Sequence, residues 1–486
     1  MPDYRVPGTY VREVERLRTI DPAASVTAFV GACAQGPVGT PVTVTSPADY
    51  HATFGPSLDA SRPLGHAVEL FFAGGGRSAV VVRAAGATPE DLVPEDGDPH
   101  AAVLDGTGVG VLVVAGLSVG HTVAVTRALR RCTAYSAVLL LDPPAGPWRS
   151  GTARDLAALT EHRERAAVFH PWVEVGGTAL PASGAVAGVI ARTDEQRGVW
   201  RAPAGTEAGL RGVDGLLSEL TDDDINELTG LGVNPIRDLP GYGPVVWGAR
   251  VLGSVQSREP SERYLSVRRL VDHVHRSLRQ GLGWAVVEPA APETWGQVRS
   301  ATTHFLHGLW RAGALVGSKE SEAYFVRVGL GETMTEADLA AGRLVVTVGL
   351  ATTRPAEFEV LQVTLLRDSP VDTAGLVLTR ADGREDGEEW AENFERLPGG
   401  AGVSLILEST TQEGVGPRLH RHPYPETFVI RRGSALFTIA GQQVPGRAGQ
   451  VLVVPAHTPH TFTTGPDGYE AVHIHAADAF ETEWLE

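Results

Sequence analysis

The sequence predicts a multidomain chain of α/β and α+β character that ends in an all-β domain. Its length of 486 residues exceeds what one core usually serves, and about 150 residues per domain suggests about three domains. From about residue 101 to 250, short apolar runs alternate with helical stretches, as α/β folds require. After Arg367-Asp-Ser-Pro370 the chain consists of short strands and tight turns, which indicates an all-β domain.

Composition excludes several classes of function. The apolar fraction of 43% and charged fraction of 20% are those of a folded protein. A formal charge of −17 disfavours nucleic acid and anionic membrane surfaces, because phosphate binding needs a concentrated positive field. The opening residues lack a signal peptide, and no apolar run is long enough for membrane insertion. With only Cys33 and Cys132, a disulfide framework is not expected and a cytoplasmic location fits.

The first part of the chain divides into three predicted domains. Residues 1–98 are strand-rich, with an N-terminal arm and runs such as Ser78-Ala-Val-Val-Val-Arg83. Residues 99–255 alternate buried strands with helices, as a central α/β domain does. Residues 256–366 form an α+β domain, with helices expected at 267–282 and 294–316 and strands at 343–350 and 357–366.

The last part is predicted to be a linker at residues 367–374 and a barrel at 375–486. Its strands are short and separated by Gly and Pro turns. One short helix is expected, at 386–396.

A group of candidate metal ligands lies in this last domain. His420, His422 and Glu426 stand at even offsets, which share one face of a strand, although Pro423 and Pro425 are expected to kink the chain between them. A fourth donor, His460, begins a later strand. Three imidazoles and one carboxylate are typical ligands of a divalent metal.

These residues follow the signature of the cupin family. The segment Gly414 to Gly433 matches G-x5-H-x-H-x3-E-x6-G, and Gly449 to His460 matches the family's second motif, G-x5-P-x4-H. The domain therefore resembles a cupin, an all-β double-stranded β-helix barrel. Two positions depart from the family: His457 stands where Gly is usual, and Thr464 where Asn is usual.

The resemblance implies one divalent metal ion, Fe, Mn, Ni, Zn or Cu, held by His420, His422, Glu426 and His460. His457, His473 and His475 are candidates to surround the ligands without binding the metal. The alternative is a barrel that keeps these residues but binds no metal or catalyses no reaction. Catalysis would depend on the metal, since this domain shows no other catalytic set; catalytic residues are not assigned.

The first 366 residues offer weaker candidates for chemistry. Gly74-Gly-Gly-Arg77 lacks the lysine and the context of a phosphate-binding loop and is read as a turn. Thr221-Asp-Asp-Asp-Ile225 has the form of a helix N-cap. His304 and His307 have no further ligand nearby, and Ser183 lacks the glycine pattern of a nucleophile elbow.

A series of segments over residues 1–366 instead resembles the contractile tail sheath proteins of phages and related injection systems. These segments occur in the family's order and include Pro7-Gly-Thr-Tyr-Val11, Phe71-Phe-Ala-Gly-Gly-Gly76, His170-Pro-Trp172, Pro181-Ala-Ser-Gly-Ala-Val-Ala-Gly188, Gly198-Val-Trp-Arg-Ala-Pro203 and Ala323-Tyr-Phe-Val326.

The sheath resemblance implies a structural subunit that stacks in hexameric rings around an inner tube protein and meets baseplate components. Neighbours would be joined by exchanged terminal strands, with residues 1–20 and 355–366 as the arms. For the second arm the alternative is an edge strand paired within its own subunit. The rival functions are a metal-dependent cupin enzyme, a dioxygenase or isomerase for example, and a cupin that binds a small ligand, each scaffolded on a sheath-like protein.

Overall fold

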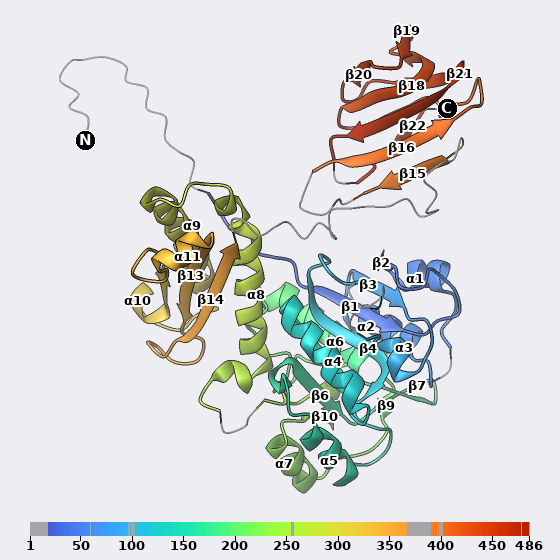
Figure 1. The fold of residues 1–486 in the computed structure, drawn as a ribbon. Helices are drawn as coiled ribbons and strands as arrows, with labels where there is room; N and C mark the ends of the chain where they lie inside the picture. Colours follow the sequence, from blue (N-terminus) through green and yellow to red (C-terminus); the bar gives the residue numbers. More distant parts are fainter. Residues whose placement is uncertain are drawn as a thin grey trace, which may run out of the picture. The chain divides into compact units, whose positions relative to one another are not determined.

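The structure is a computed structural model of the whole chain. It describes residues 18–58, 60–95, 98, 103–148, 150–253, 257–366, 390–395, 397, 402–477 and 479–485. The chain divides into two compact units, Met1–Asp368 and Ser369–Glu486 (Figure 1). We describe each unit by itself.

An eight-stranded sheet forms the centre of the first unit. Six of its strands run parallel, in the order β10-β6-β5-β4-β1-β3, and an antiparallel strand closes each edge. The predicted division at residue 98 falls between β3 and β4 of this sheet. The strands are β1 (Val26–Gly31), β2 (Pro41–Val44), β3 (Ala79–Arg83), β4 (Val109–Ser118), β5 (Val138–Asp142), β6 (Ala166–His170), β10 (Asn234–Leu239) and β11 (Gly243–Val246).

Helices cover both faces of this sheet, so its strands are apolar on both sides. Along β4, Val111 and Val113 face one hydrophobic cluster, whereas Leu112 and Val114 face another. The first cluster includes α1 (Pro47–Phe54), α2 (Leu64–Gly74) and α6 (Ser183–Arg197). The second includes α3 (Pro89–Leu92), α4 (Thr122–Tyr135), α5 (Ser150–Ala158) and α7 (Asp222–Gly230). The sequence prediction of an α/β layer is therefore confirmed.

Two helices of the first cluster, α2 and α6, approach each other through glycine. A Cβ added to Gly184 would lie 2.5 Å from backbone atoms of Ala67, and one added to Gly188 would lie 2.6 Å from the carbonyl oxygen of Phe71. Only glycine permits this distance between the helix backbones. Both glycines belong to the Pro181–Gly188 segment that carries the sheath resemblance, so that segment has a packing role.

The end of the first unit is an α+β layer. Helices α8 (Leu265–Gly281) and α9 (Pro292–Arg311) pack with the antiparallel sheet of β12 (Tyr324–Arg327), β13 (Arg343–Leu350) and β14 (Glu359–Leu366). Both predicted helices are confirmed, although α9 ends at Arg311 rather than at residue 316. Smaller elements are β7 (Val173–Val175), β8 (Thr178–Leu180), β9 (Gly215–Leu216), α10 (Glu320–Ala323), α11 (Glu336–Ala340) and three 3-10 turns at Arg163–Arg165, Pro260–Glu262 and Gly283–Val286.

A buried ion-pair network joins α8 to the large sheet. Both Oδ atoms of Asp272 lie 2.6 Å from the Arg165 guanidinium, and Arg268 donates a third hydrogen bond at 2.9 Å. Asp272 is almost fully buried, so its charge needs these partners. The network ties α8 to the start of β6.

The second unit is a curled antiparallel sheet, consistent with a β-barrel (Figure 1). Its core consists mainly of aromatic residues, among them Phe428, Phe437 and Phe462. The strands are β15 (Trp390–Phe394), β16 (Ser404–Thr410), β17 (His420–Arg421), β18 (Glu426–Ile439), β19 (Gln442–Arg447), β20 (Val451–Val454), β21 (His460–His475) and β22 (Glu483–Trp484).

The prediction of a short helix at 386–396 is wrong for the described residues, because Trp390–Phe394 form strand β15. This strand pairs in antiparallel fashion with β16, from Trp390 opposite Ser409 to Phe394 opposite Leu405. Pairing with a strand that follows later in the chain outweighs local helix propensity here. Among the described helices, none is both long and apolar enough to cross a membrane.

The glycine contact between α2 and α6 leads to a testable prediction. Gly188→Ala should destabilise the first unit by about 1–3 kcal/mol, because the added methyl group meets backbone that cannot rotate away. The control is Gly296→Ala in α9, where a Cβ meets nothing within 4 Å. That change should be neutral or stabilise by about 0.5–1 kcal/mol. Denaturant unfolding of the two variants measures the difference, and equal stabilities would contradict the packing role.

Candidate metal centre

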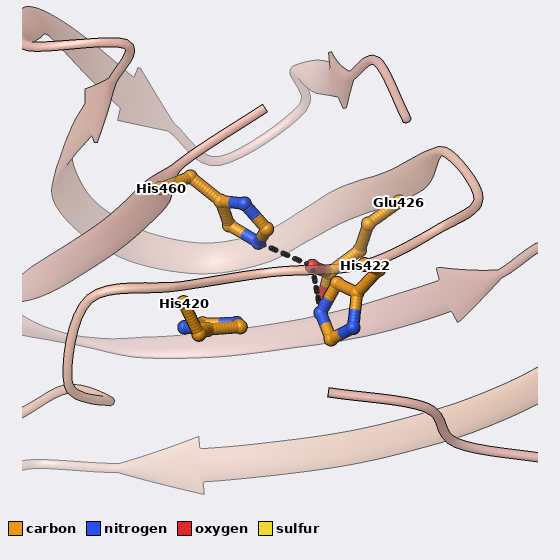
Figure 2. A group of neighbouring side chains, drawn as sticks. All are labelled: His420, His422, Glu426 and His460. Atoms are coloured by element: carbon orange, nitrogen blue, oxygen red, sulfur yellow. Dashed lines mark hydrogen bonds and ion pairs between the residues drawn. The ribbon is translucent and has the colours of Figure 1, made fainter. Parts of the chain in front are cut away.

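The four predicted ligands come together inside the second unit. His420, His422, Glu426 and His460 are all buried, and one potential ligand atom from each lies within 4.8 Å of those of the others (Figure 2). Among the described residues this is the one group of His, Cys, Asp and Glu side chains with such an arrangement. The cluster therefore has the donor types and the closeness that a divalent ion requires.

Strand ends place these side chains. His420 in β17 pairs directly with His460, the first residue of β21, and Glu426 is the first residue of β18. His422 lies between β17 and β18, in the segment that contains Pro423 and Pro425. The prolines thus interrupt the strand, as the sequence predicts, and the cluster is built from strand ends and a loop rather than from one face of a continuous strand.

Backbone carbonyls hold all three imidazoles by the same ring nitrogen. Nδ1 of His420 lies 2.7 Å from the carbonyl of Arg418, Nδ1 of His422 lies 2.8 Å from that of Glu481, and Nδ1 of His460 lies 2.8 Å from that of Thr458. A carbonyl can only accept, so each Nδ1 carries the proton and donates. In the neutral ring, Nε2 then keeps its lone pair, which is how metal-binding histidines are oriented.

These lone pairs meet a carboxylate. Oε2 of Glu426 lies 2.7 Å from Nε2 of His460 and 3.3 Å from Nε2 of His422 (Figure 2). The buried Nε2 of His422 has no hydrogen bond. Two acceptors at these distances repel unless a cation, either a proton or a metal ion, lies between them. The residues present therefore fit a metal ion.

The charges of the cluster follow from this geometry. Burial alone would raise the pKa of Glu426, but contacts with His422, His460 and His475 outweigh burial and hold the pKa well below its usual value. Burial lowers the pKa of His420. For His422 the effect of burial is exceeded by the contact with Glu426, and its pKa rises. Glu426 is thus an ionised carboxylate at neutral pH.

Two of the three surrounding histidines lie beside Glu426. His475 stands directly opposite Glu426 on the neighbouring strand, with Nε2 3.2 Å from Oε1. His473 lies 3.7 Å from the same oxygen and 3.6 Å from Glu408. Its pKa is lowered to about 4 by burial. Both rings are buried, but neither residue belongs to the group of four potential metal ligands.

His457 occupies a different place. Its side chain is exposed, and it contributes through its backbone, whose N–H donates to the carbonyl of His422 at 2.7 Å. Its φ angle of 60° lies in the left-handed region. Glycine adopts this conformation at little cost, which explains why the cupin motif usually has Gly here.

The C-terminal residues that support the site are not apparent from the sequence. Trp484 pairs with His420 in register and its ring lies 5.2 Å from the imidazole. Arg421 forms two hydrogen bonds of 2.8 Å with Glu483, and the hydroxyl of Tyr424 donates to the carbonyl of Glu481. These partners stand about sixty positions apart in the sequence, and no local pattern links them.

The weaker candidates of the first unit have structural roles. His307 pairs with Glu320 at 2.9 Å, and neither it nor His304 joins a metal-binding group among the described residues. Thr221 caps α7 and exchanges hydrogen bonds with Asp224, as the N-cap prediction requires. Gly75 ends α2 in a left-handed conformation, which confirms a turn there. Ser183 donates its N–H to Asp142 at the start of α6.

Comparison with known proteins relates the first unit to sheath proteins. Residues 107–251 match the family of the phage tail sheath protein central domain. The sheath of the extracellular contractile injection system PVC, in its contracted state, is 31% identical with a TM-score of 0.59, over 74% of this chain and 98% of that one. The contracted helical sheath of the anti-feeding prophage is 31% identical with a TM-score of 0.57, over 73% and 98%.

Curated proteins match shorter stretches of both units. The tail sheath protein of Vibrio phage KVP40 is 28% identical over 110 residues, which are 22% of this chain and 16% of that protein. Residues 407–475 match the cupin domain family. The dimethylsulfoniopropionate lyase DddW of Ruegeria pomeroyi is 36% identical over 64 residues, 13% of this chain and 42% of the enzyme. The chain thus spans less than half the length of either curated relative.

Proposed function

This chain belongs to the family of contractile-injection-system sheath proteins and ends in a cupin domain, and we propose that it assembles as stacked hexameric rings around an inner tube. The observation that supports this proposal best is the 31% identity that extends over 98% of the PVC sheath chain. The anti-feeding prophage baseplate, also 31% identical, was solved with six-fold symmetry. The inner tube and the baseplate are the partners that we propose.

Strand addition between subunits is supported by the open edge of β14. This strand pairs with β13 of its own chain over eight residue pairs. Segment 355–366 thus contains an edge strand paired within its own subunit, which is the alternative to an exchanged arm. Its other edge has no partner among the described residues. Such an edge, with Val360 64% exposed, favours pairing with a strand of a neighbour. The proposed donor, residues 1–20, lies outside the described residues up to position 17.

For the cupin domain we propose one divalent ion held by Nε2 of His420, His422 and His460 and by Glu426. The carbonyls at Nδ1 direct the three imidazoles inward, and His475 holds the second carboxylate oxygen. A bound ion would supply a Lewis acid that polarises a coordinated oxygen. The four residues of the cluster would bind the ion and fix its position. Because the cluster is buried, bulk water is excluded from it.

A second candidate is a metal-dependent enzyme scaffolded on the sheath unit. The observation that favours it is the 36% identity with the lyase DddW over 64 residues. Incubating the metal-loaded chain with dimethylsulfoniopropionate tests it, because an active chain would consume that compound and a His420→Ala variant would not. Unchanged substrate with both proteins would reject this lyase activity.

Assembly is tested by electron microscopy of the purified chain. We expect rings or tubes, and we expect a version ending at residue 366 to form them too, because the described sheath elements end with β14. A full chain that forms none, under conditions where the truncated version does, would contradict assembly of the cupin-bearing subunit.

Metal binding is tested by elemental analysis. The chain should retain about one equivalent of a divalent metal, and the variant His420→Ala/His422→Ala should lose it. His457→Asn is the control, because the His457 side chain is exposed and Asn tolerates its left-handed backbone. Protein free of metal after expression with ample Fe, Mn, Ni and Zn would reject the site.

His475 should act on the site as a positioning residue. Replacing His475 with Phe removes the contact to Oε1 of Glu426 and should weaken metal affinity about 10–100-fold, whereas His475→Gln, which can still donate, should lose less. Competition titration with a chelator measures both. Equal affinities for the parent and the two variants would show that Glu426 needs no such support.

A further inference from the structure

The outer surface of the cupin sheet is apolar where it should be polar. Antiparallel sheets that cover a core on one side usually alternate apolar with polar residues. Here one row of side chains crosses four strands in direct register, from Val451 in β20 through Val429 in β18 and Val472 in β21 to Leu407 in β16. All four residues are aliphatic.

A second row lies beside the first. It runs from Val453 through Thr427 and Ile474 to Leu405. The neighbours of these residues along the strands, such as Phe428 and Val454, face the core instead. Val451 and Val453 are 62% and 58% exposed, and the other members of the two rows are partly exposed. We call the two rows the outer apolar face.

The same strands provide an internal comparison. Farther along β18 and β21, the outward positions include Thr438, Thr461 and Thr463, paired as Thr438 with Thr461. That part is more polar, although Leu436, which pairs with Thr463, is 40% exposed. At the border between the two parts, Arg431 and Arg432 both pair with Glu470. The outer apolar face is thus uncharged in its centre and bordered on this side by charged residues, as the core and rim of protein interfaces are.

We propose that the outer apolar face binds the same face of a second copy of this cupin domain, and this inference rests on the proposed assembly of the sheath unit. A surface without charge is complementary to itself. A sheath of many subunits would bring one cupin domain per subunit, so another cupin is the apolar partner at the highest local concentration.

The size of the face sets the strength of this contact. Four strands about 4.8 Å apart, with about four residues of 3.4 Å each, cover on the order of 250 Å². Stable complexes bury about 800 Å² on each partner. The face can therefore form the centre of an interface but holds two free chains together only weakly. Pairing should increase steeply when assembly concentrates the domains.

Cysteine cross-linking of the full chain tests the contact. With a short bifunctional maleimide, Val453→Cys should give about ten-fold more cross-linked dimer than Thr463→Cys, which is also an exposed position but lies farther along β21. The parent chain, whose Cys33 is half-buried and Cys132 buried, sets the background. Adding Val451→Lys to Val453→Cys should abolish the cross-link, and adding Thr461→Lys should not.

Two outcomes would overturn the proposal. In the first, Val453→Cys cross-links no more than Thr463→Cys, both in tubes and in concentrated free chain. The face would then be covered by residues 367–389, by another protein, or by nothing. Cross-linking that persists with Val451→Lys would place the contact elsewhere. Failure of the sheath proposal is distinguishable, because electron microscopy would then show no rings while concentrated free chain still cross-links through Val453→Cys.

Discussion

The cupin interior depends on one buried charge, the carboxylate of Glu426. A buried carboxylate is costly unless cationic or donor groups surround it. Here the loop between β17 and β18 and the start of β21 bring the imidazoles of His422 and His460 to one of its oxygens, and His475 approaches the other. Because carbonyls take the Nδ1 protons, the rings next to Oε2 can meet it only with a cation between them. The same contacts that make the buried charge tolerable are therefore compatible with a bound metal ion.

The first unit is stabilised by other contacts than those of the cupin domain. Its large sheet is covered on both faces, glycines let α6 lie against α2, and a buried aspartate fixes α8 to the sheet. These contacts hold together the elements of a subunit that belongs to the sheath family. Among the described residues, the outer edge of β14 has no partner, which leaves a place where a neighbour can add a strand.

Much of this could be predicted from the sequence, and the failures have a common cause. The α/β and α+β layers follow from periodicity, and the four residues of the buried His and Glu cluster follow from motif spacing. The strand at Trp390–Phe394 was missed because it depends on pairing with β16, which local propensity does not encode. The support from Glu481, Glu483 and Trp484 was missed for the same reason, since it arises only when β22 pairs with β17. His457, an apparent departure from the motif, is explained by its backbone angle.

We propose that one subunit combines a sheath body with a metal-binding cupin. A cryo-EM map of tubes assembled from the full chain would test this combination. We expect stacked rings of six subunits, with density for an ion between His420, His422, Glu426 and His460 in each cupin domain. Ordered cupin domains without that density, or a chain that forms no tube, would contradict it.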